Sequence, residues 1–264
     1  MECASSHAPM SGMIPFPAAM ALSLSVVFPM HDEEEYVRRA VAAAREGAGA
    51  VGEDYEILIV DDASTDRTLE IGEALAKEDS RVRVLHQPRR RGLGGTLRAG
   101  YAATTRELVL YSDADLPFDF REVSRAARLL EYQEADVLAA YRFDRTSEGL
   151  LRTLYTLAYS GLVRGLFGLR FRDVNFSFKL FRRHLLERID LRSEGSFIDA
   201  EFLVRARNAG ARIIQMGVDY FPRSRGRSTL ASPAVIVGIL WEMARLAPGL
   251  WWEARLPAPS RRGQ

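Results

Sequence analysis

The sequence predicts an α/β fold in which a mostly parallel central sheet is covered by helices on both faces. The first observation is that short apolar runs alternate with segments of helical periodicity from Leu22 onward. Strands that alternate with helices form βαβ units, and such units build parallel sheets. The second is that acidic residues directly follow apolar runs, at the sheet edge where α/β proteins bind ligands. The third is length, because 264 residues are enough for one large domain.

The first part of the chain accounts for most of the expected sheet. Each predicted strand is a short apolar run, and each predicted helix follows with helical periodicity. The glycines between residues 92 and 95 form an expected turn in front of the third helix. We expect strands over residues 22–28, 56–60, 81–85, 108–111 and 137–140, and helices over residues 33–44, 68–77, 96–103 and 121–132.

After residue 145 the pattern changes. Leu150–Phe167 is a long, apolar-rich helix candidate, and the tail from Ser232 to Trp252 is expected to be helical until Pro248. Further elements are a strand over 177–180, a helix over 198–208 and a strand over 212–216. We therefore divide the chain into a disordered leader (1–20), one large domain (21–231), and a C-terminal amphipathic helix with its tail (232–264).

The composition argues against several classes of protein. A net charge of +1 gives no global field of the kind that marks nucleic-acid-binding proteins, so we expect no nucleic-acid partner. Cys3 is the only cysteine, which excludes an internal disulfide and suits a cytoplasmic protein. Residues 1–20 contain no Lys or Arg, unlike a secretory signal. No run reaches the roughly 18–20 apolar residues that a membrane span needs.

Acidic residues stand at the ends of two predicted strands. Asp61 and Asp62 follow the second strand, and Asp113 and Asp115 follow the fourth. Carboxylates that face one another are costly without a counter-ion, and a hard cation such as Mg²⁺ or Mn²⁺ removes that cost. The spacing of Asp113 and Asp115 allows both to approach one metal ion from a tight loop. The alternative is that they are turn-forming aspartates.

The glycine-rich stretch from Arg91 to Gly95 allows more than one interpretation. It begins like a dinucleotide-binding fingerprint, but Leu97 stands at the sixth position and the stretch follows the third strand. Two interpretations remain open. One is a close turn into a helix, and the other is a loop near phosphates to which Arg90 or Arg91 adds charge.

Together these motifs resemble family 2 inverting glycosyltransferases, over roughly residues 22–230. In order they are Pro29-Met30-His31-Asp32-Glu33, Val60-Asp61-Asp62-Ala63-Ser64-Thr65-Asp66, Gly92-Leu93-Gly94 and Asp113-Ala114-Asp115. The second half resembles the polyprenyl-phosphate branch, which includes the dolichol-phosphate mannose synthases. Its motifs are Tyr141-Arg142, Arg152 with Thr156, Asp173-Val174-Asn175-Phe176-Ser177-Phe178-Lys179, and Arg223-Ser224-Arg225-Gly226-Arg227-Ser228.

The resemblance implies a glycosyltransferase A fold and a set of site residues. The implied ligands are a GDP- or UDP-linked sugar, a polyprenyl phosphate acceptor, and Mg²⁺ or Mn²⁺. Asp113 and Asp115 would meet the metal, while Arg223 and Ser228 would lie on a mobile loop near the diphosphate. The remaining donor contacts would be Pro29, Asp32, Glu33, Asp61 and Gly92, and the lipid phosphate would be received by Arg142, Arg152 and Thr156.

The sequence departs from the family pattern at three places. Asp32 stands where Asn is usual, and Pro117 replaces a Gln that often follows the second metal aspartate. That metal ligand must then be water or another group. Phe176-Ser177-Phe178 lacks the family's usual Gly between Ser and Phe.

The nature of the acceptor decides which catalytic groups are needed. A lipid phosphate, with a second pKa of about 6, is largely ionised at neutral pH and needs cations more than a base. A sugar hydroxyl would need a carboxylate base, and Asp199 or Glu201 is then the candidate. The alternative is that both residues cap or brace the helix that starts at Ile198. The predicted catalytic residues are Asp115, Asp199 and Arg223.

Two other expectations concern class and location. A nucleotide-sugar-binding protein without turnover is the alternative to an enzyme, and an unrelated Rossmann-like enzyme is a further one. Many relatives carry C-terminal membrane helices, which this tail does not match. We expect a cytoplasmic protein whose tail either lies in the membrane interface through Trp241, Trp251 and Trp252 or packs on the domain. Such attachment would be peripheral, on the inner face of the membrane.

Overall fold

The computed structural model of this protein describes residues 22–144, 150–222 and 233–255. The side chains of residues 150–157, 233 and 234 are not among the described parts. The predicted leader, Arg223 and Ser228 therefore lie outside the described residues. Arg152 and Thr156 fall in a described helix, but their side chains lie outside the description.

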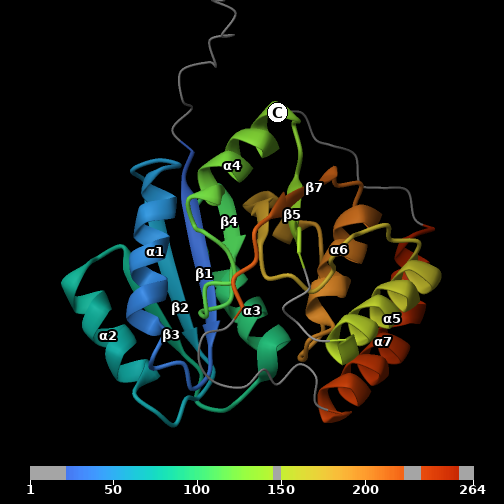
Figure 1. Cartoon of the computed structure of the whole chain (residues 1–264), viewed down its shortest axis with the longest axis horizontal. Coiled ribbons are helices and arrows are strands. Elements are labelled where there is room, and N and C mark those ends of the chain that lie inside the picture. The colour runs from blue at the N-terminus through green and yellow to red at the C-terminus, as the bar shows by residue number, and fades with distance from the viewer. Residues whose placement is uncertain (1–21, 145–149, 223–232, 256–264) are drawn as a thin grey trace, which may run out of the picture.

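A seven-stranded sheet forms the centre of the molecule, with strand order β3-β2-β1-β4-β6-β5-β7 (Figure 1). Among the described strands only β6 runs antiparallel to its neighbours. The predicted α/β fold with a mostly parallel sheet is confirmed. The strands are β1 (Leu24–Met30), β2 (Tyr55–Asp61), β3 (Val82–His86), β4 (Leu108–Tyr111), β5 (Val137–Arg142), β6 (Lys179–Arg182) and β7 (Ile213–Val218).

Helices cover both faces of this sheet, as expected. The helices α1 (Val37–Gly49), α2 (Thr68–Glu78) and α4 (Glu122–Tyr132) belong to the apolar core on one face. The other face is covered by α3 (Gly92–Ala103), α5 (Leu150–Phe167), α6 (Ile198–Asn208) and α7 (Pro233–Glu253). In Figure 1 the last three of these helices form a group beside β5 and β7.

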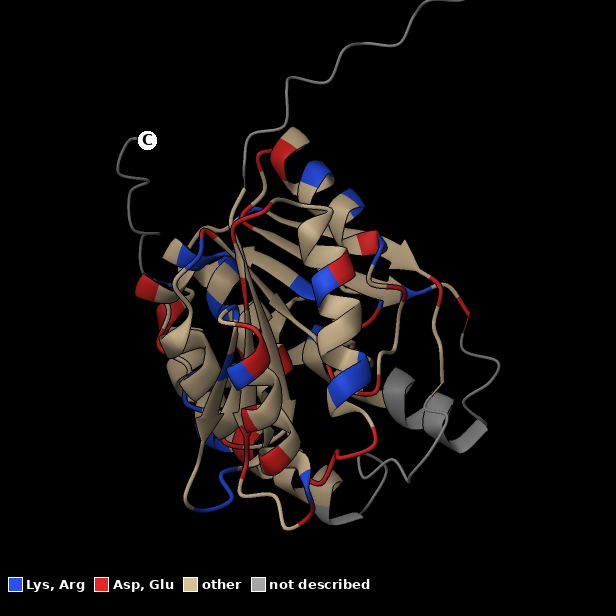
Figure 2. Ribbon diagram, turned by 90° about the vertical axis from the view of Figure 1, so that its left-hand side faces the viewer, with Lys and Arg blue, Asp and Glu red and all other residues tan. Residues whose placement is uncertain are grey.

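The apolar runs of the sequence explain why two cores form. Successive side chains of a strand point to opposite faces of the sheet. Val26 and Phe28 of β1 accordingly join the core under α1, while Val27 between them joins the core under α3. Figure 2 shows that charged residues lie mostly on the helices and in the loops, while the strands are mostly tan. The strands are thus buried on both sides, as parallel sheets require.

Several predicted boundaries were wrong. The helix expected from Glu33 starts at Val37, because residues 33–36 form a turn in which the Glu33 carbonyl accepts the amides of Tyr36 and Val37. The strand expected at 177–180 lies at Lys179–Arg182. It leads into a 3₁₀ helix, η2 (Arg183–Glu187), that the sequence analysis did not predict.

Two further errors concern glycine and proline. The glycines expected to form a turn before residue 96 instead form the first turn of α3, which begins at Gly92. The tail helix does not stop at Pro248 but continues to Glu253. Proline removes one helical hydrogen bond, yet Met243, Ala247 and Leu250 are buried against the core, so packing holds the helix together. None of the helices in the described part of the chain combines the length and apolarity of a transmembrane segment.

A close approach near the end of α1 fixes how this helix meets the loop before α4. A Cβ atom added to Gly47 would lie 2.5 Å from the Phe120 carbonyl oxygen and 3.0 Å from its Cβ. Gly49, in the same helix, has nothing within 4 Å of its added Cβ. Glycine is therefore required by packing at the first position and not at the second.

We predict that Gly47→Ala lowers the free energy of unfolding by about 1–3 kcal/mol, because the backbone of Phe120 must move away. Gly49→Ala is the matched control and should leave stability unchanged or raise it by about 0.4–1 kcal/mol. Urea denaturation of both variants measures the difference. Equal stabilities of the two variants would contradict the close packing at Gly47.

Candidate functional site

The site lies at the carboxyl edge of the sheet, around β1. This strand lies between β2 and β4, and all three run in parallel. The chain continues from β1 to β2 and β3 on one side and then to β4 on the other. A crevice opens beyond the strand ends where connections diverge in this way, and α/β proteins bind ligands there. The loops after β1, β2 and β4 all lie at this edge of the sheet.

The loop after β4 carries the predicted metal aspartates. Asp113 and Asp115 are both half-buried, and the Tyr111 hydroxyl donates a hydrogen bond of 3.0 Å to Asp113 Oδ1. Burial raises the pKa of Tyr111 well above its usual value, and the charge of Asp113 adds to that effect. Tyr111 thus remains a neutral donor that orients Asp113. Asp115 is also one of the residues that line a surface pocket of about 310 Å³.

These two carboxylates fit a divalent metal that is shared with a diphosphate. No cluster of three or more His, Cys, Asp or Glu suited to a metal ion occurs among the described residues. Magnesium, however, is usually bound by one or two carboxylates together with substrate phosphates and water. A two-aspartate loop at a ligand crevice matches that donor set, and Mn²⁺ accepts the same oxygen ligands.

Asp32 links the loops that follow β1 and β2. Its Oδ1 accepts hydrogen bonds from the Thr65 amide at 2.7 Å and the Thr65 hydroxyl at 3.2 Å. The Thr65 amide is the main reason why the pKa of Asp32 lies below its usual value. The neighbouring Glu33 amide donates to the Thr68 hydroxyl at 2.8 Å. Pro29, also predicted at this site, is a half-buried residue of β1 itself.

Asp61 and Asp62 have different partners. Asp61 is fully buried at the end of β2, and its Oδ2 lies 2.8 Å from His86 Nδ1. Asp62 accepts the amides of Arg91 and Gly92, at 2.7 and 2.9 Å, and thereby supplies acceptors for amides at the N-terminus of α3. The sequence analysis missed both His86 and this capping role. The available signal for His86 was its position at the end of the next strand.

The glycine stretch is packed against another part of the chain. Gly92 has a φ of +72°, a conformation that favours glycine, and its amide is bonded to Asp62. The Gly94 amide donates to the Glu194 carbonyl at 2.8 Å. A Cβ at Gly94 would lie only 2.3 Å from the Ser193 carbonyl oxygen. This geometry makes the glycine stretch the closely packed first turn of α3, and a contact of Gly92 with the nucleotide sugar stays a prediction.

Arg142, predicted to receive the acceptor phosphate, is a buried residue at the end of β5. Its Nε and Nη2 donate to Asp173 Oδ2 and Oδ1, at 2.7 and 3.2 Å. The guanidinium also lies over the rings of Phe176 and Tyr220, 5.5 and 5.1 Å from their centroids. Two donors of its fork are therefore used within the protein. A direct contact between Arg142 and phosphate remains a prediction.

Asp199 forms a buried ion pair with Lys179. The distance from Lys179 Nζ to Asp199 Oδ1 is 2.5 Å, and Nζ also donates to the Phe176 carbonyl at 2.8 Å. Burial raises the pKa of Asp199 to about 6, although Lys179 opposes the shift. Lys179 also lies over the Tyr111 ring, 5.5 Å from its centroid. Through this ring the pair lies close to the Asp113 loop.

Glu201, the other candidate base, braces the chain. It is fully buried and accepts the amides of Arg192 and Ser193 at 2.9 and 2.7 Å. It also accepts Arg205 Nε at 2.7 Å. Both of its oxygens are therefore used to hold the segment before α6, which is the bracing role considered for it.

Comparison with solved structures identifies the fold. TarS 1–349 from S. aureus, solved in complex with UDP-GlcNAc, matches with a TM-score of 0.64 and 20% identity over 90% of this chain and 68% of that one. Glucosyl-3-phosphoglycerate synthase from Mycobacterium tuberculosis, solved with Mn²⁺ and UDP-glucose, matches with a TM-score of 0.59 and 21% identity over 89% and 80%. These likenesses confirm the expected glycosyltransferase A fold.

Curated proteins give more direct relatives. Glycosyltransferase AglD of Haloferax volcanii is 30% identical over 242 residues, covering 89% of this chain and 38% of the relative. Dodecaprenyl-phosphate galacturonate synthase of Rhizobium johnstonii is 27% identical over 210 residues, covering 79% and 62%. The chain thus spans less than two thirds of the length of either relative.

The sequence model of Glycosyl transferase family 2 matches residues 25–190, from β1 through η2. That segment contains the loops after β1, β2 and β4 that form the crevice. The chain belongs to Glycosyl transferase family 2.

Proposed function

We propose that this protein is a metal-dependent, inverting glycosyltransferase that moves a sugar from a nucleotide sugar to a polyprenyl phosphate. The observation that carries the proposal is the Asp113–Asp115 loop, which follows β4 beside β1. The chain connections on the two sides of β1 run in opposite directions there, and a diphosphate and a metal can meet at that edge of the sheet. Relatives support the acceptor. One is named a dodecaprenyl-phosphate galacturonate synthase, and others are named undecaprenyl-phosphate 4-deoxy-4-formamido-L-arabinose transferases.

The donor half of the site is assigned to the loops after β1, β2 and β4. Asp61 and the Asp32–Glu33 loop are proposed to contact the nucleoside. Asp113 and Asp115 would hold the divalent ion, which when bound neutralises charge on the leaving diphosphate. Tyr111 keeps the Asp113 carboxylate oriented toward it. Arg223 and Ser228 are proposed to reach the diphosphate. Uridine nucleotides are bound by the two structural neighbours, but either UDP or GDP is compatible with the proposal.

The acceptor half is assigned to the ends of β5 and α5. A lipid phosphate is already largely ionised near neutral pH, so it attacks the anomeric carbon without a protein base. Positive groups are needed to hold it beside the donor. Arg142, Arg152 and Thr156 are the proposed group. Asp173 engages two donors of Arg142 and so orients its guanidinium, and we propose that the oriented guanidinium contributes positive charge to the phosphate site.

The alternative acceptor is a sugar hydroxyl. Such an acceptor needs a general base, and Asp199 has the required properties because its pKa of about 6 leaves it ionised at neutral pH. The buried ion pair with Lys179 provides a second explanation for the burial of Asp199. In this explanation Asp199 only holds Lys179 over the Tyr111 ring. Removing both charges of the pair distinguishes a role of Asp199 as a general base from a purely structural role.

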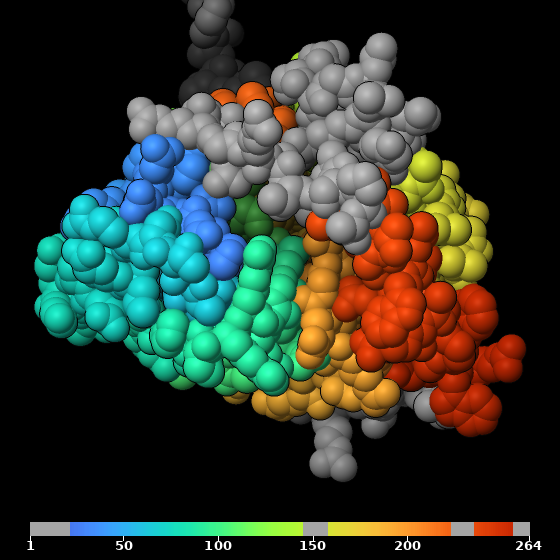
Figure 3. Space-filling model, turned by 90° about the horizontal axis from the view of Figure 1, so that it is seen from below, coloured from blue at the N-terminus to red at the C-terminus, as the bar shows by residue number. Residues whose placement is uncertain are grey.

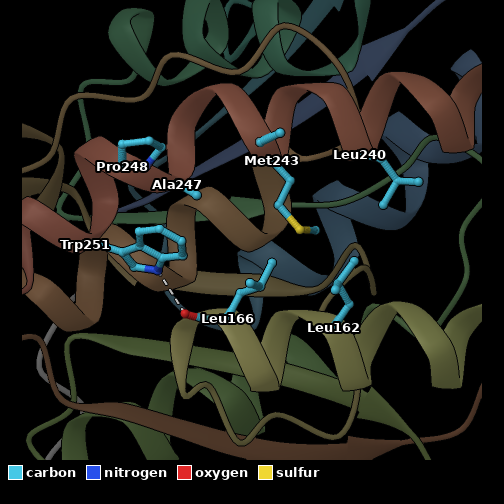
Figure 4. A pocket seen from close by; sticks show the side chains of 8 residues that line it. Leu162, Leu166, Leu240, Met243, Ala247, Pro248 and Trp251 are labelled. Atoms are coloured by element: carbon cyan, nitrogen blue, oxygen red, sulfur yellow. Dashed lines mark hydrogen bonds between the residues drawn. The ribbon is translucent and has the colours of Figure 1, made fainter.

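The lipid acceptor makes contact with a membrane surface part of the proposal. An apolar groove of about 310 Å³ lies between α5 and α7. Figure 4 shows Leu162 and Leu166 of α5 pointing toward Met243 and Trp251 of α7, with a hydrogen bond from Trp251 Nε1 to the Leu166 carbonyl. The core-facing residues of α7 are buried, so the tail packs on the domain and still exposes an apolar edge.

The chemistry of this edge fits an anionic bilayer. Trp241 and Trp252 are 61% and 65% exposed, and tryptophan prefers the boundary between headgroups and acyl chains. In the described parts of α5 and α7, the exposed charged side chains are Arg164 and Arg245, and both are cationic. Arg245 lies over the Trp241 ring, 4.9 Å from its centroid. We therefore propose that α5 and α7 rest on the membrane that holds the acceptor.

The metal role predicts loss of transfer when either the ion or its ligand is removed. We expect Asp115→Ala to reduce sugar transfer by a factor of about 100 or more, since removing one strong stabiliser of transition-state charge has effects of this size. EDTA should abolish transfer by the wild type, and added Mg²⁺ or Mn²⁺ should restore it. Thermal melting serves as the folding control. Full activity of the wild type in EDTA would refute the metal role.

Replacing both members of the buried ion pair tests the acceptor. Asp199→Asn alone leaves the Lys179 ammonium without its counter-charge, and we expect a loss of stability of about 3–5 kcal/mol. Adding Lys179→Met removes both charges and should recover most of that loss. If the acceptor is a phosphate, the double variant still forms a product that is extracted into organic solvent with polyprenyl phosphate. A folded but inactive double variant would favour a hydroxyl acceptor and Asp199 as its base.

Vesicle binding tests the membrane surface. We expect a variant with Trp241→Gln and Trp252→Gln to bind phosphatidylglycerol vesicles about tenfold more weakly than the wild type, because two interfacial anchors are lost. Tyr132→Gln is the control, since Tyr132 is 80% exposed on α4 and away from this surface. Co-sedimentation measures the binding. Equal binding by the wild type and the tryptophan variant would remove this surface from the proposal.

A further inference from the structure

The segment from Ser193 to Gly195 lies between α7 and the start of α3. Figure 3 shows the three parts side by side, with α3 in green, the segment before and within α6 in orange, and α7 in red. The view is toward the carboxyl edge of β1, β2 and β4. The family match ends at residue 190, so this segment and α7 lie beyond the matched part of the chain.

A buried carboxylate of α7 holds one side of this segment. Glu242 is 6% exposed, and its Oε1 accepts the amides of Glu194 and Gly195, at 2.7 and 2.9 Å. A Cβ atom added to Gly195 would lie 3.0 Å from Glu242 Oε2. The glycine therefore allows the carboxylate to approach the backbone closely. Hydrogen bonds to an ionised acceptor are about twice as strong as neutral ones.

The other side of the segment holds the N-terminus of α3. The Glu194 carbonyl accepts the amides of Gly94 and Gly95, at 2.8 and 3.3 Å. A Cβ at Gly92 would lie 2.7 Å from that carbonyl oxygen. The peptide unit between Glu194 and Gly195 makes both contacts. Its N–H, from Gly195, donates to Glu242, and its carbonyl, from Glu194, accepts the Gly94 amide of α3. A shift of this segment therefore directly moves the carbonyl that holds the glycine turn, which is the first turn of α3 from Gly92 to Gly95.

The glycine turn is in turn bonded to the donor side of the site. Asp62 accepts the amides of Arg91 and Gly92, and it is the neighbour of Asp61. The Asp62 carbonyl lies 2.9 Å from His31 Nδ1, in the loop after β1. Asp32, which follows His31, accepts the Thr65 amide and so holds the loop after β2. A continuous series of hydrogen bonds thus runs from α7 to the loops after β1 and β2.

We propose that Glu242 is a positioning residue, through which α7 holds the nucleotide-binding loops in their binding-competent arrangement. The proposal rests on the proposed function, because it assigns those loops to the donor. Glu242 does not touch the donor in this scheme. When its carboxylate is removed, the 193–195 segment loses two charge-assisted hydrogen bonds and the glycine turn loses a fixed support. The competent arrangement is then less populated, and the apparent affinity for nucleotide falls in proportion.

Nucleotide affinity of Glu242 variants tests this proposal. We expect Glu242→Ala to raise the dissociation constant for UDP or GDP with Mg²⁺ by about tenfold, measured by calorimetry on the full chain. The donor KM should rise by a similar factor, with a smaller change in kcat. Glu242→Gln retains an oxygen at the position of Oε1, and we expect it to bind nucleotide within about threefold of the wild type.

Glu253 supplies a matched control on the same helix. It anchors α7 to α6 through a salt bridge with Arg205, and its link to the 193–195 segment is indirect, through Arg205 and Glu201 to the Ser193 amide. Glu253→Ala should leave nucleotide affinity within about twofold of the wild type. If it weakens binding as much as Glu242→Ala, general loosening of α7 explains the effect and the proposal is wrong. Unchanged affinity in a folded Glu242→Ala protein would also overturn it.

Hydrogen exchange on the wild type tests the coupling if Glu242→Ala does not fold. Coupling between two sites is reciprocal, so UDP or GDP with Mg²⁺ should slow exchange at the Glu194 and Gly195 amides. Unchanged exchange at both amides, with nucleotide bound, would contradict the proposal. A wild type that binds neither nucleotide would contradict the proposed function itself and this proposal with it.

Discussion

The placement of β1 between two parallel neighbours is the constraint on which the rest of the structure depends. Because β2 and β4 flank β1 in parallel, three loops open at one edge, and divergent connections leave a crevice there. Strands buried on both faces must be apolar along their length, so polar chemistry is confined to their ends. Asp61 and the Asp113–Asp115 loop stand at such ends. The same constraint therefore forms the core and concentrates acidic groups at the candidate site.

Buried carboxylates fix the irregular segments around this edge. Asp62 satisfies the start of α3, Glu201 holds residues 192 and 193, and Glu242 holds residues 194 and 195. Backbone amides that leave regular structure in a buried place need acceptors, and an ionised carboxylate can serve two at once. Asp62, Glu201 and Glu242 thus hold the scaffold through backbone amides. Asp32 and Asp61 also accept amides but belong to the proposed donor contacts, and the half-buried Asp113 and Asp115 remain the proposed metal ligands.

The outer surface of α5 and α7 complements the crevice. A lipid-linked phosphate is confined to a bilayer, so an enzyme that uses one must approach that surface. The surface of α5 and α7 suits such an approach, because it has exposed tryptophans, an apolar groove and exposed arginine side chains. The helix that carries the tryptophans also carries Glu242, so one element connects the apolar edge with the loops of the donor side.

The sequence by itself determined the α/β class, the order of most strands and helices, the family and the two acidic strand ends. These features depend on local periodicity and on motifs that are contiguous in the chain. Only the tertiary structure decided that Asp62 caps α3, that Asp61 meets His86, that Arg142 pairs with Asp173 and that Glu201 braces residues 192 and 193. It also decided that the glycines begin a helix and that α7 continues through Pro248. Each of these depends on partners distant in sequence or on packing, and a carboxylate's residue type does not reveal whether backbone amides will surround it once the chain has folded.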